Sequence, residues 1–268
     1  MEASEELTHD RRNIRRLVLE AAFAANKGHI GSALSIVDIL LAAEIALGPF
    51  YTQKRESNLV LSKGHAASAL YALMTLRGQL TQQNLESYCS DGSILGTHPS
   101  VELAGVTFAS GSLGQGLGVA AGLALADRIE CSDRRTLCVL SDAELNEGST
   151  WEALLVANHH KLRNLVVAVD LNGQQALGRT QEVLNTDGVA SAVAALGWQV
   201  RVVSGHDVGA MVAAMKDFPE DRPLLLLCET ILGSGVSFME KRIEWHYLPV
   251  NSEQFADAVA EVMKGNPR

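Results

Sequence analysis

The chain has 268 residues, of which 47% are hydrophobic and 20% are charged, and its formal net charge is −9. This length and composition are ordinary for one globular domain, so we expect residues 1–268 to form a single domain. A general binder of nucleic-acid backbones needs clustered Lys and Arg, and the acidic balance therefore excludes that class of protein.

Cysteine usage and the absence of an apolar leader both indicate a cytoplasmic protein. The four cysteines form no CxxC pair, and Cys138 and Cys228 lie inside aliphatic runs, where they behave as small apolar residues. The first ten residues are acidic, and the longest apolar stretch, 33–47, contains two carboxylates. We expect no targeting segment and no membrane-spanning segment.

The amino-terminal part is expected to be mainly helical. Apolar residues recur at helical spacing over 5–25, beside a cluster of four arginines that we interpret as a solvated face. A second helix over 35–47 ends at a Gly-Pro pair, a strand follows over 58–61, and a helix over 64–77 ends before Gly78. This part therefore contributes one strand to the expected sheet.

The segment 111–126 is unusual because small or apolar residues occupy nearly every face of the helix that it predicts. Its five glycines disfavour an isolated helix, so close packing must compensate. We therefore expect it to be buried all round and to contact a partner surface as well as the core. The glycine spacing resembles a dinucleotide-binding motif, but no strand directly precedes it, which argues against nicotinamide binding.

Two aliphatic runs, 136–140 and 165–169, have the length and character of buried parallel strands. The segment 151–162 between them has apolar residues at helical spacing, so the unit fits one strand, helix, strand crossover. Asp142 and Asn172 each follow one of these strands and are therefore expected at the same edge of the sheet.

That edge is where open parallel sheets bind ligands. Asp142 offers a carboxylate, Asn172 an amide oxygen and Gln174 a backbone carbonyl, and this set suits Mg²⁺ bridging a diphosphate better than it suits zinc. The alternative is that Asp142 caps the helix beginning near Gly148 and that Asn172 belongs only to a turn.

Helices and strands continue to alternate towards the carboxyl end. We expect helices over 187–195 and 207–217, strands over 198–202 and 223–228, and one more short helix after Asn251. The sequence has no repeat, no low-complexity tract and no linker between compositionally different halves. The fold class is therefore α/β, with a mostly parallel central sheet flanked by helices.

Four of the eight histidines lie in predicted loops or at the start of a predicted helix: His29, His65, His98 and His246. Each of them alone is more often structural. Together they have a chemical logic, because a carbanion enzyme acting on polyhydroxylated sugars needs neutral imidazoles that exchange hydroxyl protons near pH 7.

With these motifs in order, the sequence resembles the amino-terminal, diphosphate-binding portion of the transketolases, from about Arg11 to Leu248. The matching segments are 61–65 (Leu-Ser-Lys-Gly-His), 111–116 (Gly-Ser-Leu-Gly-Gln-Gly), 142–148 and 233–239. The resemblance is closest to split transketolases, in which a second polypeptide supplies the pyrimidine-binding domain.

The resemblance implies the three-layer thiamine-diphosphate-binding fold, with thiamine diphosphate and Mg²⁺ as cofactors. The implied metal ligands are Asp142, Asn172 and the Gln174 carbonyl. The implied cofactor contacts are His65, Gly111, Leu113, Asp142, Ala143, Glu144, Asn172 and His246. The implied catalytic residues are His29, His65, His98 and His246. Glu147 and Glu152 resemble carboxylates that relay protons between paired sites, and the alternative is that they are plain interface residues.

The resemblance also implies that this chain is half of an enzyme. The pyrimidine-binding domain, with the glutamate that activates the cofactor, is expected on a separate C-terminal subunit in an α₂β₂ assembly. We therefore expect the chain alone to be inactive. The implied activity is transfer of a two-carbon ketol unit from a ketose or ketose phosphate donor to an acceptor.

The chain departs from the family pattern around Asp142 and after His246. Ser141 and Ala143 stand where glycines are usual, which would cost about 1 kcal/mol or more at a position that needs positive φ. Tyr247 stands where a glycine is common and would narrow the substrate channel. Three alternatives stay open: a non-catalytic subunit with a decayed site, transfer to a carrier-bound thiol, and a 2-oxo acid dehydrogenase α-subunit. The last lacks the four histidines, so sugar chemistry is preferred.

Overall fold

A five-stranded parallel sheet forms the centre of the computed structural model, which describes residues 2–52 and 56–265. Its strands, in spatial order, are β1 (Ser57–Leu61), β2 (Arg135–Ser141), β3 (Leu165–Leu171), β7 (Leu224–Glu229) and β6 (Gln199–Ser204). The strands predicted from the aliphatic runs are all present, and the α/β class is confirmed.

The aliphatic runs are continuous because both faces of the sheet are covered. Side chains alternate between the two faces of a strand, so neighbours on β2 enter different clusters. Leu137 and Val139 belong to one hydrophobic cluster, and Cys138 and Leu140 belong to the other. All four side chains are fully buried.

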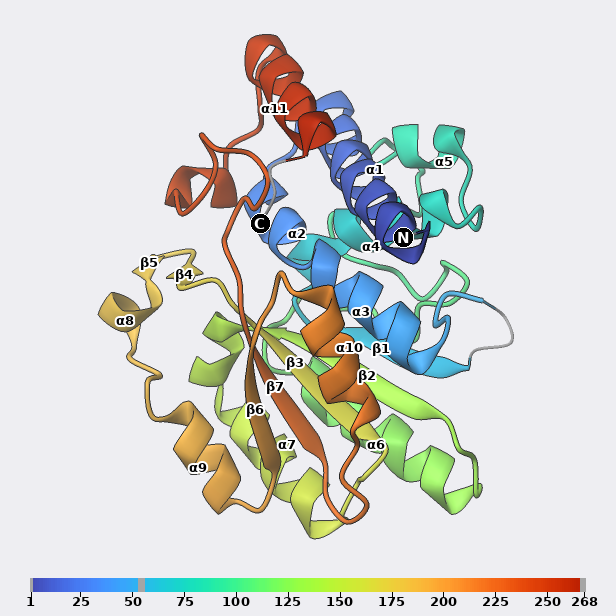
Figure 1. The fold of residues 1–268 in the computed structure, drawn as a ribbon, viewed down its shortest axis with the longest axis vertical. Helices are drawn as coiled ribbons and strands as arrows, with labels where there is room; N and C mark the ends of the chain where they lie inside the picture. The colour runs from blue at the N-terminus through green and yellow to red at the C-terminus, as the bar shows by residue number, and fades with distance from the viewer. Residues whose placement is uncertain (1, 53–55, 266–268) are drawn as a thin grey trace.

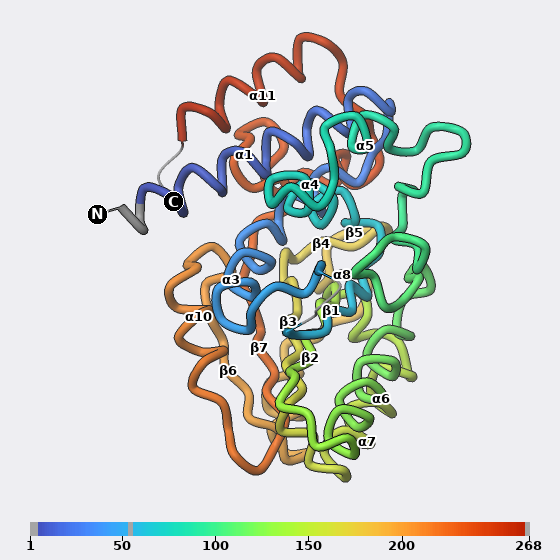
Figure 2. Tube along the Cα trace, turned by 90° about the vertical axis from the view of Figure 1, so that its right-hand side faces the viewer, coloured from blue at the N-terminus to red at the C-terminus, as the bar shows by residue number. Residues whose placement is uncertain are grey.

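Helices cover the two faces in separate layers, as Figure 2 shows. One face carries α3 (Val37–Leu47) and α10 (Val208–Lys216), which contact each other extensively. The other carries α6 (Gly116–Ile129) and α7 (Gly148–His159), with α9 (Val189–Ala195) packed into the same cluster. The crossover predicted between β2 and β3 is therefore confirmed, with α7 as its helix.

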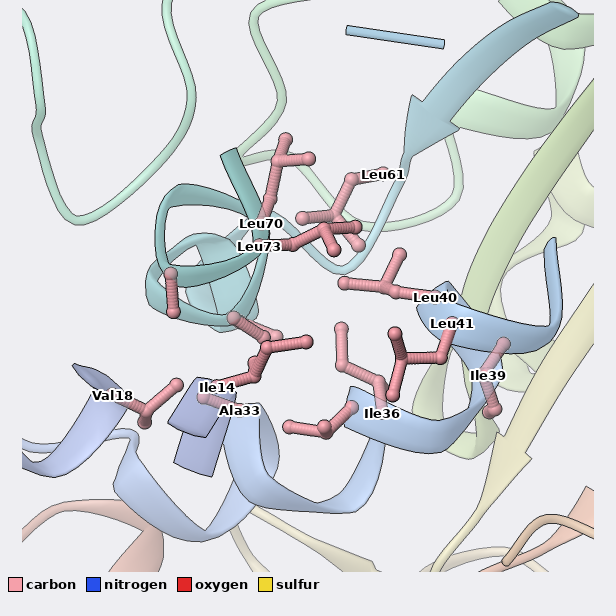
Figure 3. Packing of buried hydrophobic residues seen from close by; sticks show 14 of the residues in the cluster. Ile14, Val18, Ala33, Ile36, Ile39, Leu40, Leu41, Leu61, Leu70 and Leu73 are labelled. Atoms are coloured by element: carbon pink, nitrogen blue, oxygen red, sulfur yellow. The ribbon is translucent and has the colours of Figure 1, made fainter. Parts of the chain in front are cut away.

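A further group of helices lies beyond the carboxyl ends of the strands (Figure 1). Its members are α1 (Glu2–Ala24), α2 (Ile30–Ser35), α4 (Ala67–Leu76), α5 (Gln82–Glu86) and α11 (Ser252–Lys264). Ile14 and Val18 of α1 join Ile36, Leu70 and Leu73 in the larger hydrophobic cluster (Figure 3). This helical group closes the space above the strand ends, where the polar residues predicted for the site lie.

Short elements occupy the loops at that edge. They are η1 (Gly64–Ala66), η2 (Asp142–Asn146), β4 (Gln174–Gln175), β5 (Gly178–Arg179), α8 (Thr180–Val183) and η3 (Ile243–His246). The strands β4 and β5 pair as an antiparallel hairpin. None of these was expected as a separate element, because each is too short to produce a hydrophobic period.

The helix predicted over 35–47 is confirmed as α3, and a separate short helix that was not predicted precedes it. This short helix, α2, begins at Ile30 and ends at Ser35, and Ile36 separates it from α3. By length and composition, the stretch Ile30–Leu47 passes for a membrane span, but 83% of it is buried inside the structure. It is a core segment of the described fold.

The glycine-rich helix α6 is not buried all round. Gly118 and Gly122 are exposed, and Ile129 is 74% exposed. One side of α6 is therefore left open within this chain, and the expectation that it contacts a partner surface stays a prediction.

The arginine cluster of α1 is also not a solvated face. Arg15 is buried, and it forms an ion pair with the fully buried Asp38, with Nη2 to Oδ2 at 2.7 Å. Arg11 pairs with the same carboxylate. The spacing on one helix could not reveal a partner that lies on another helix.

Candidate functional site

The candidate site lies where β1, β2 and β3 end. His65 follows β1 through η1, Asp142 follows β2, and Asn172 follows β3. The register places Ser141 of β2 opposite Asp170 of β3, so the residues after them share one edge of the sheet. This juxtaposition is the one expected from the crossover.

Asp142 is held at this edge by donors from outside its own strand. Its Oδ2 accepts hydrogen bonds from Thr180 Oγ1 at 2.6 Å and from Gly173 N at 3.1 Å. The N-cap of α7 is Glu147, so the alternative in which Asp142 caps that helix is wrong. Burial raises the pKa of Asp142 to about 6, and a bound cation would favour its ionised form.

Hydrogen bonds at both the nitrogen and the oxygen of the Asn172 side-chain amide fix its orientation. Its Nδ2 donates to Asp170 Oδ2 at 2.9 Å, and its Oδ1 accepts from Gln174 N at 3.0 Å. The second bond closes an Asx turn, so the turn interpretation is correct for the backbone. It does not exclude a ligand role, because an amide oxygen has a second lone pair.

The donor set fits a hard cation that shares its coordination with a diphosphate. The described residues contain no group of three or more His, Cys, Asp or Glu side chains arranged for a metal. The predicted set has one carboxylate, one amide oxygen and one backbone carbonyl, and Mg²⁺ commonly takes few protein ligands together with phosphate oxygens.

Behind the metal-ligand candidates, Lys63 and Asp170 form a buried ion pair whose two side chains are both 0% exposed. Asp170 also accepts hydrogen bonds from the Ser35 and Thr230 hydroxyls and from Asn172. Burial alone would raise the pKa of Asp170, but Lys63 and these donors hold it below its usual value. The carboxylate therefore ties four separate segments together beneath the site.

Sequence reasoning missed this pair, although a signal was present. Asp170 interrupts an otherwise aliphatic strand. Because both faces of the sheet are covered, its carboxylate must be buried, and a buried charge requires a partner. Lys63 stands two residues after the end of β1, at the same edge. Because the carboxyl ends of parallel strands meet at one edge of the sheet, the predicted strands could have indicated that Lys63 and Asp170 lie close together.

Three of the predicted histidines form a compact cluster. The ring centroids of His29, His65 and His246 are 5.4 to 5.5 Å apart. His29 caps α2 with φ of 62°, in the left-handed region, and its N–H donates to the His246 carbonyl at 3.2 Å. Such a conformation for a residue other than Gly is uncommon and is often found at functional sites.

His98 lies at the edge of this cluster. A Cβ added to Gly64 would meet the Ser110 Oγ at 2.3 Å and the His98 Cδ2 at 3.0 Å, so only a glycine permits this approach. The structure therefore brings together all four histidines that the sequence singled out, whereas their catalytic roles stay predictions.

Burial and the Lys63 charge keep these imidazoles neutral. Burial, then Lys63 and His246, lower the pKa of His65 well below its usual value. Burial, then His29 and Lys63, lower the pKa of His246 to about 4. Burial is also the main cause of the lowered pKa values of His29 and His98. At neutral pH the cluster can therefore accept protons from hydroxyl groups.

Ser141 and Ala143, which stand beside Asp142 where glycines are usual, carry no backbone strain. Ser141 has φ of −89°, and Ala143 is not among the residues with positive φ. The cost expected for a left-handed residue is therefore absent. Ala143 N donates to Asp142 Oδ1 at 2.9 Å, which leaves this segment in an ordinary helical turn.

Glu144 is turned into the interior. Its side chain is 0% exposed and accepts hydrogen bonds from Ser62 Oγ, from Gly114 N at 3.0 Å and from Ser141 N at 2.9 Å. The carboxylate braces the acidic hairpin against the start of the glycine-rich segment. Its side chain has no free face towards the sheet edge, so a cofactor contact here would come from the backbone.

The remaining candidates lie around the rim. Gly111 is exposed and Leu113 is half-buried, both before α6. Glu147 packs against Gly114, and Glu152 is exposed on α7. Tyr247 contacts the His246 ring with centroids 5.0 Å apart, and its hydroxyl donates to the Ala176 carbonyl in the β4–β5 hairpin.

Comparison with known proteins gives one consistent result. Residues 8–263 match the family described as transketolase, thiamine diphosphate binding domain. The chain is 34% identical over 257 residues to one of the subunits of the apulose-4-phosphate transketolase of Phocaeicola vulgatus, covering 94% of this chain and 91% of that protein. It is 32% identical over 268 residues to 6-deoxy-6-sulfo-D-fructose transketolase subunit SqwG of Clostridium sp., covering 97% of each.

Solved structures give the same relationship. The transketolase of Campylobacter jejuni superposes with a TM-score of 0.89 at 28% identity. The match covers 96% of this chain but only 42% of that one. The chain thus spans less than half of this single-chain relative and nearly all of the two subunit relatives.

Proposed function

The chain belongs to the transketolase family as its thiamine-diphosphate-binding part and is one subunit of a transketolase-like transferase, and we propose that it transfers a two-carbon ketol unit from a ketose or ketose phosphate to an acceptor. The observation that best supports this is the cluster of His29, His65 and His246 beside the edge that carries Asp142 and Asn172. The two subunit relatives are named for a phosphorylated and a sulfonated ketose, which favours a donor with an anionic terminus.

Thiamine diphosphate, when bound, supplies the carbon nucleophile that cleaves the ketose. We propose that Mg²⁺ is held by Asp142, Asn172 and the Gln174 carbonyl, with the diphosphate at the same edge. The neutral imidazoles of His29 and His98 orient donor hydroxyls and accept a proton as the carbon–carbon bond breaks. His65 and His246 stand nearer the cofactor and shape the wall of the site.

The partner is proposed to be a C-terminal subunit that carries the pyrimidine-binding domain, in an α₂β₂ assembly in the cytoplasm. The groove between α6 and α7 suits such a partner, because it is lined by small residues including Gly118, Gly122 and Ala153, and by the half-exposed Val156. An apolar groove of this kind on one side of a core helix is typical of a subunit interface.

The test of the proposed function is reconstitution. The chain, its partner subunit, thiamine diphosphate and Mg²⁺ should convert a ketose phosphate and an aldehyde acceptor to a new ketose, and each protein alone should be inactive. Release of the donor's aldehyde product without cofactor, or an unchanged donor in the full mixture, contradicts the proposal. Product formed only when a carrier-bound thiol replaces the aldehyde would move the assignment to the carrier alternative.

Replacing His29 with Asn or His98 with Ala is expected to lower kcat/KM for the ketose by about 10²- to 10⁴-fold, because each removes a proton acceptor. Asn is chosen at position 29 because it tolerates the left-handed backbone. Affinity for thiamine diphosphate should stay within about threefold, measured by calorimetry on the assembled enzyme. His9→Ala on the exposed face of α1 is the matched control. Full turnover by both variants would refute the substrate assignment.

Replacing Gly122 with Leu is expected to weaken binding of the partner subunit by about tenfold or more, since the new side chain fills the groove. A Cβ at Gly122 meets no atom within 4 Å, so the chain should fold and gain about 1 kcal/mol of helix stability. Gly209→Leu on the opposite face, in α10, is the control. Association is measured by calorimetry, and equal affinities for the two variants would place the partner elsewhere.

A further inference from the structure

A second cavity lies away from the histidine cluster, between α1, α11 and the loop that follows β7. Its volume is about 210 Å³, which is below the roughly 300–1,000 Å³ of sites for drug-sized ligands. Its wall includes Arg11, Arg12, Arg15, Ser234, Gly235 and Gly265. Three arginines therefore surround a small space, and the proposed transferase function does not use this cavity.

Two of these arginines, Arg11 and Arg15, form ion pairs with the buried carboxylate of Asp38. Arg15 donates to both of its oxygens, and Arg11 Nε donates to Oδ1 at 2.7 Å. His206 completes the arrangement: its Nε2 accepts from Ile231 N at 2.9 Å, which leaves Nδ1 as the donor to Asp38 Oδ2. Asp38 is therefore saturated and has no capacity for a further cation.

Arg12 differs from its neighbours. Its Nε is buried without a hydrogen-bond partner, and among the described side chains of residues 5–52 and 56–265 no carboxylate forms an ion pair with it. A Cβ at Gly265, which has φ of 72°, would lie 2.2 Å from Arg12 Nη2, so the glycine backbone confines the guanidinium. A buried donor on a charged group carries a large desolvation cost unless a ligand satisfies it.

The charge around the cavity also favours an anion. Three guanidiniums face two carboxylates, those of Asp38 and Glu240, and Glu240 Oε1 accepts from Gly235 N at 3.2 Å. Ser234 also lines the cavity, and its carbonyl accepts from Arg15 Nε at 3.2 Å. One positive charge and a planar set of N–H donors therefore remain for a ligand, which suits the tetrahedral oxyanions that arginine binds through paired hydrogen bonds.

We propose that this cavity is a binding site for a small oxyanion of the phosphate class, with Arg12 as its principal ligand. The anion lies between α1 and α11 and fixes the end of α11 against the body of the fold. The same chemistry can come from inorganic phosphate or from the phosphoryl group of a small ester, and the cavity volume limits the ester to a few carbon atoms.

The site is tested by ³¹P NMR and calorimetry on the full chain, with inorganic phosphate as the probe. Arg12→Ala should weaken phosphate binding by about tenfold or more, and Arg12→Lys should weaken it less because it keeps the charge. Arg16→Ala is the matched control, since Arg16 lies on the same helix but pairs with Glu20 and does not line the cavity. Thermal melting in chloride confirms that each variant is folded.

Phosphate can also bind at the sheet edge near Asp142, so all titrations are repeated with Asp142→Asn. The component lost with Arg12→Ala should persist in that variant. Tighter binding of glycerol phosphate than of inorganic phosphate would identify an ester as the ligand, and the reverse order would identify the free anion. The proposal is overturned if wild type binds neither probe, or if Arg12→Ala and Arg16→Ala bind them equally. Neither result bears on the transferase function.

Discussion

Replacing Asp170 with Ala is expected to destabilise the folded chain by about 3–5 kcal/mol, one of the largest effects of any single substitution in this protein. The Lys63 ammonium is 0% exposed, and removal of its partner leaves a buried charge without compensation. The hydroxyls of Ser35 and Thr230 lose their acceptor at the same time. Urea denaturation of the isolated chain, followed by circular dichroism, measures the change.

A double-mutant cycle separates the ion pair from the packing. Lys63→Met removes the ammonium with little change in volume, and Asp170→Asn removes the negative charge but keeps an acceptor. Each single substitution should be strongly destabilising, whereas the double variant should lose at least about 1 kcal/mol less than the sum of the two. Additive losses, or a cost below about 1 kcal/mol for Asp170→Ala, would show that the pair does not hold the strand ends together.

The sequence carries enough information for the fold and for the edge where the site lies. Unbroken aliphatic runs arise only where both faces of a strand are covered, so they indicated buried parallel strands, and the crossover placed Asp142 beside Asn172. The histidine motifs marked loops at the same edge. Both inferences depend on local patterns with a fixed geometric meaning.

What the sequence could not supply are contacts between segments far apart in the chain. Asp170 receives donors from residues 35, 63 and 230, and Asp38 receives Arg11, Arg15 and His206. Apart from the Lys63–Asp170 pair, for which the strand ends gave a signal, no spacing rule predicts these sets. A run of charges on a helix is usually solvated, so the arginines of α1 were interpreted as a solvated face. That interpretation is corrected only by the position of α3, which places Asp38 against them.

The left-handed conformation of His29 was also beyond sequence reasoning. Histidine adopts positive φ more readily than most residues but still uncommonly, and the strain is tolerated because hydrogen bonds hold both the N–H and the carbonyl of His29. The His246 carbonyl accepts from His29 N, and the His29 carbonyl accepts from Ala33 N. The backbone thus determines which imidazoles meet, and the cluster depends on η3 as much as on α2.

Replacing Asp142 with Asn is expected to weaken Mg²⁺-dependent binding of thiamine diphosphate by about 100-fold or more, because the carboxylate is the only charged group in the proposed ligand set. The variant should fold, since the amide oxygen can still accept from Thr180 Oγ1 and Gly173 N. Calorimetry of the assembled enzyme across a series of Mg²⁺ concentrations measures the loss.

A control must separate loss of the metal from loss of charge at the sheet edge. Glu147→Gln removes a carboxylate from the next turn and should leave the Mg²⁺ dependence unchanged, because Glu147 packs against Gly114 and is not one of the proposed ligands. If Asp142→Asn binds the cofactor with wild-type affinity at every Mg²⁺ concentration, the cation is not held at this edge. The buried carboxylate would then serve only to anchor Thr180 and the hairpin before it.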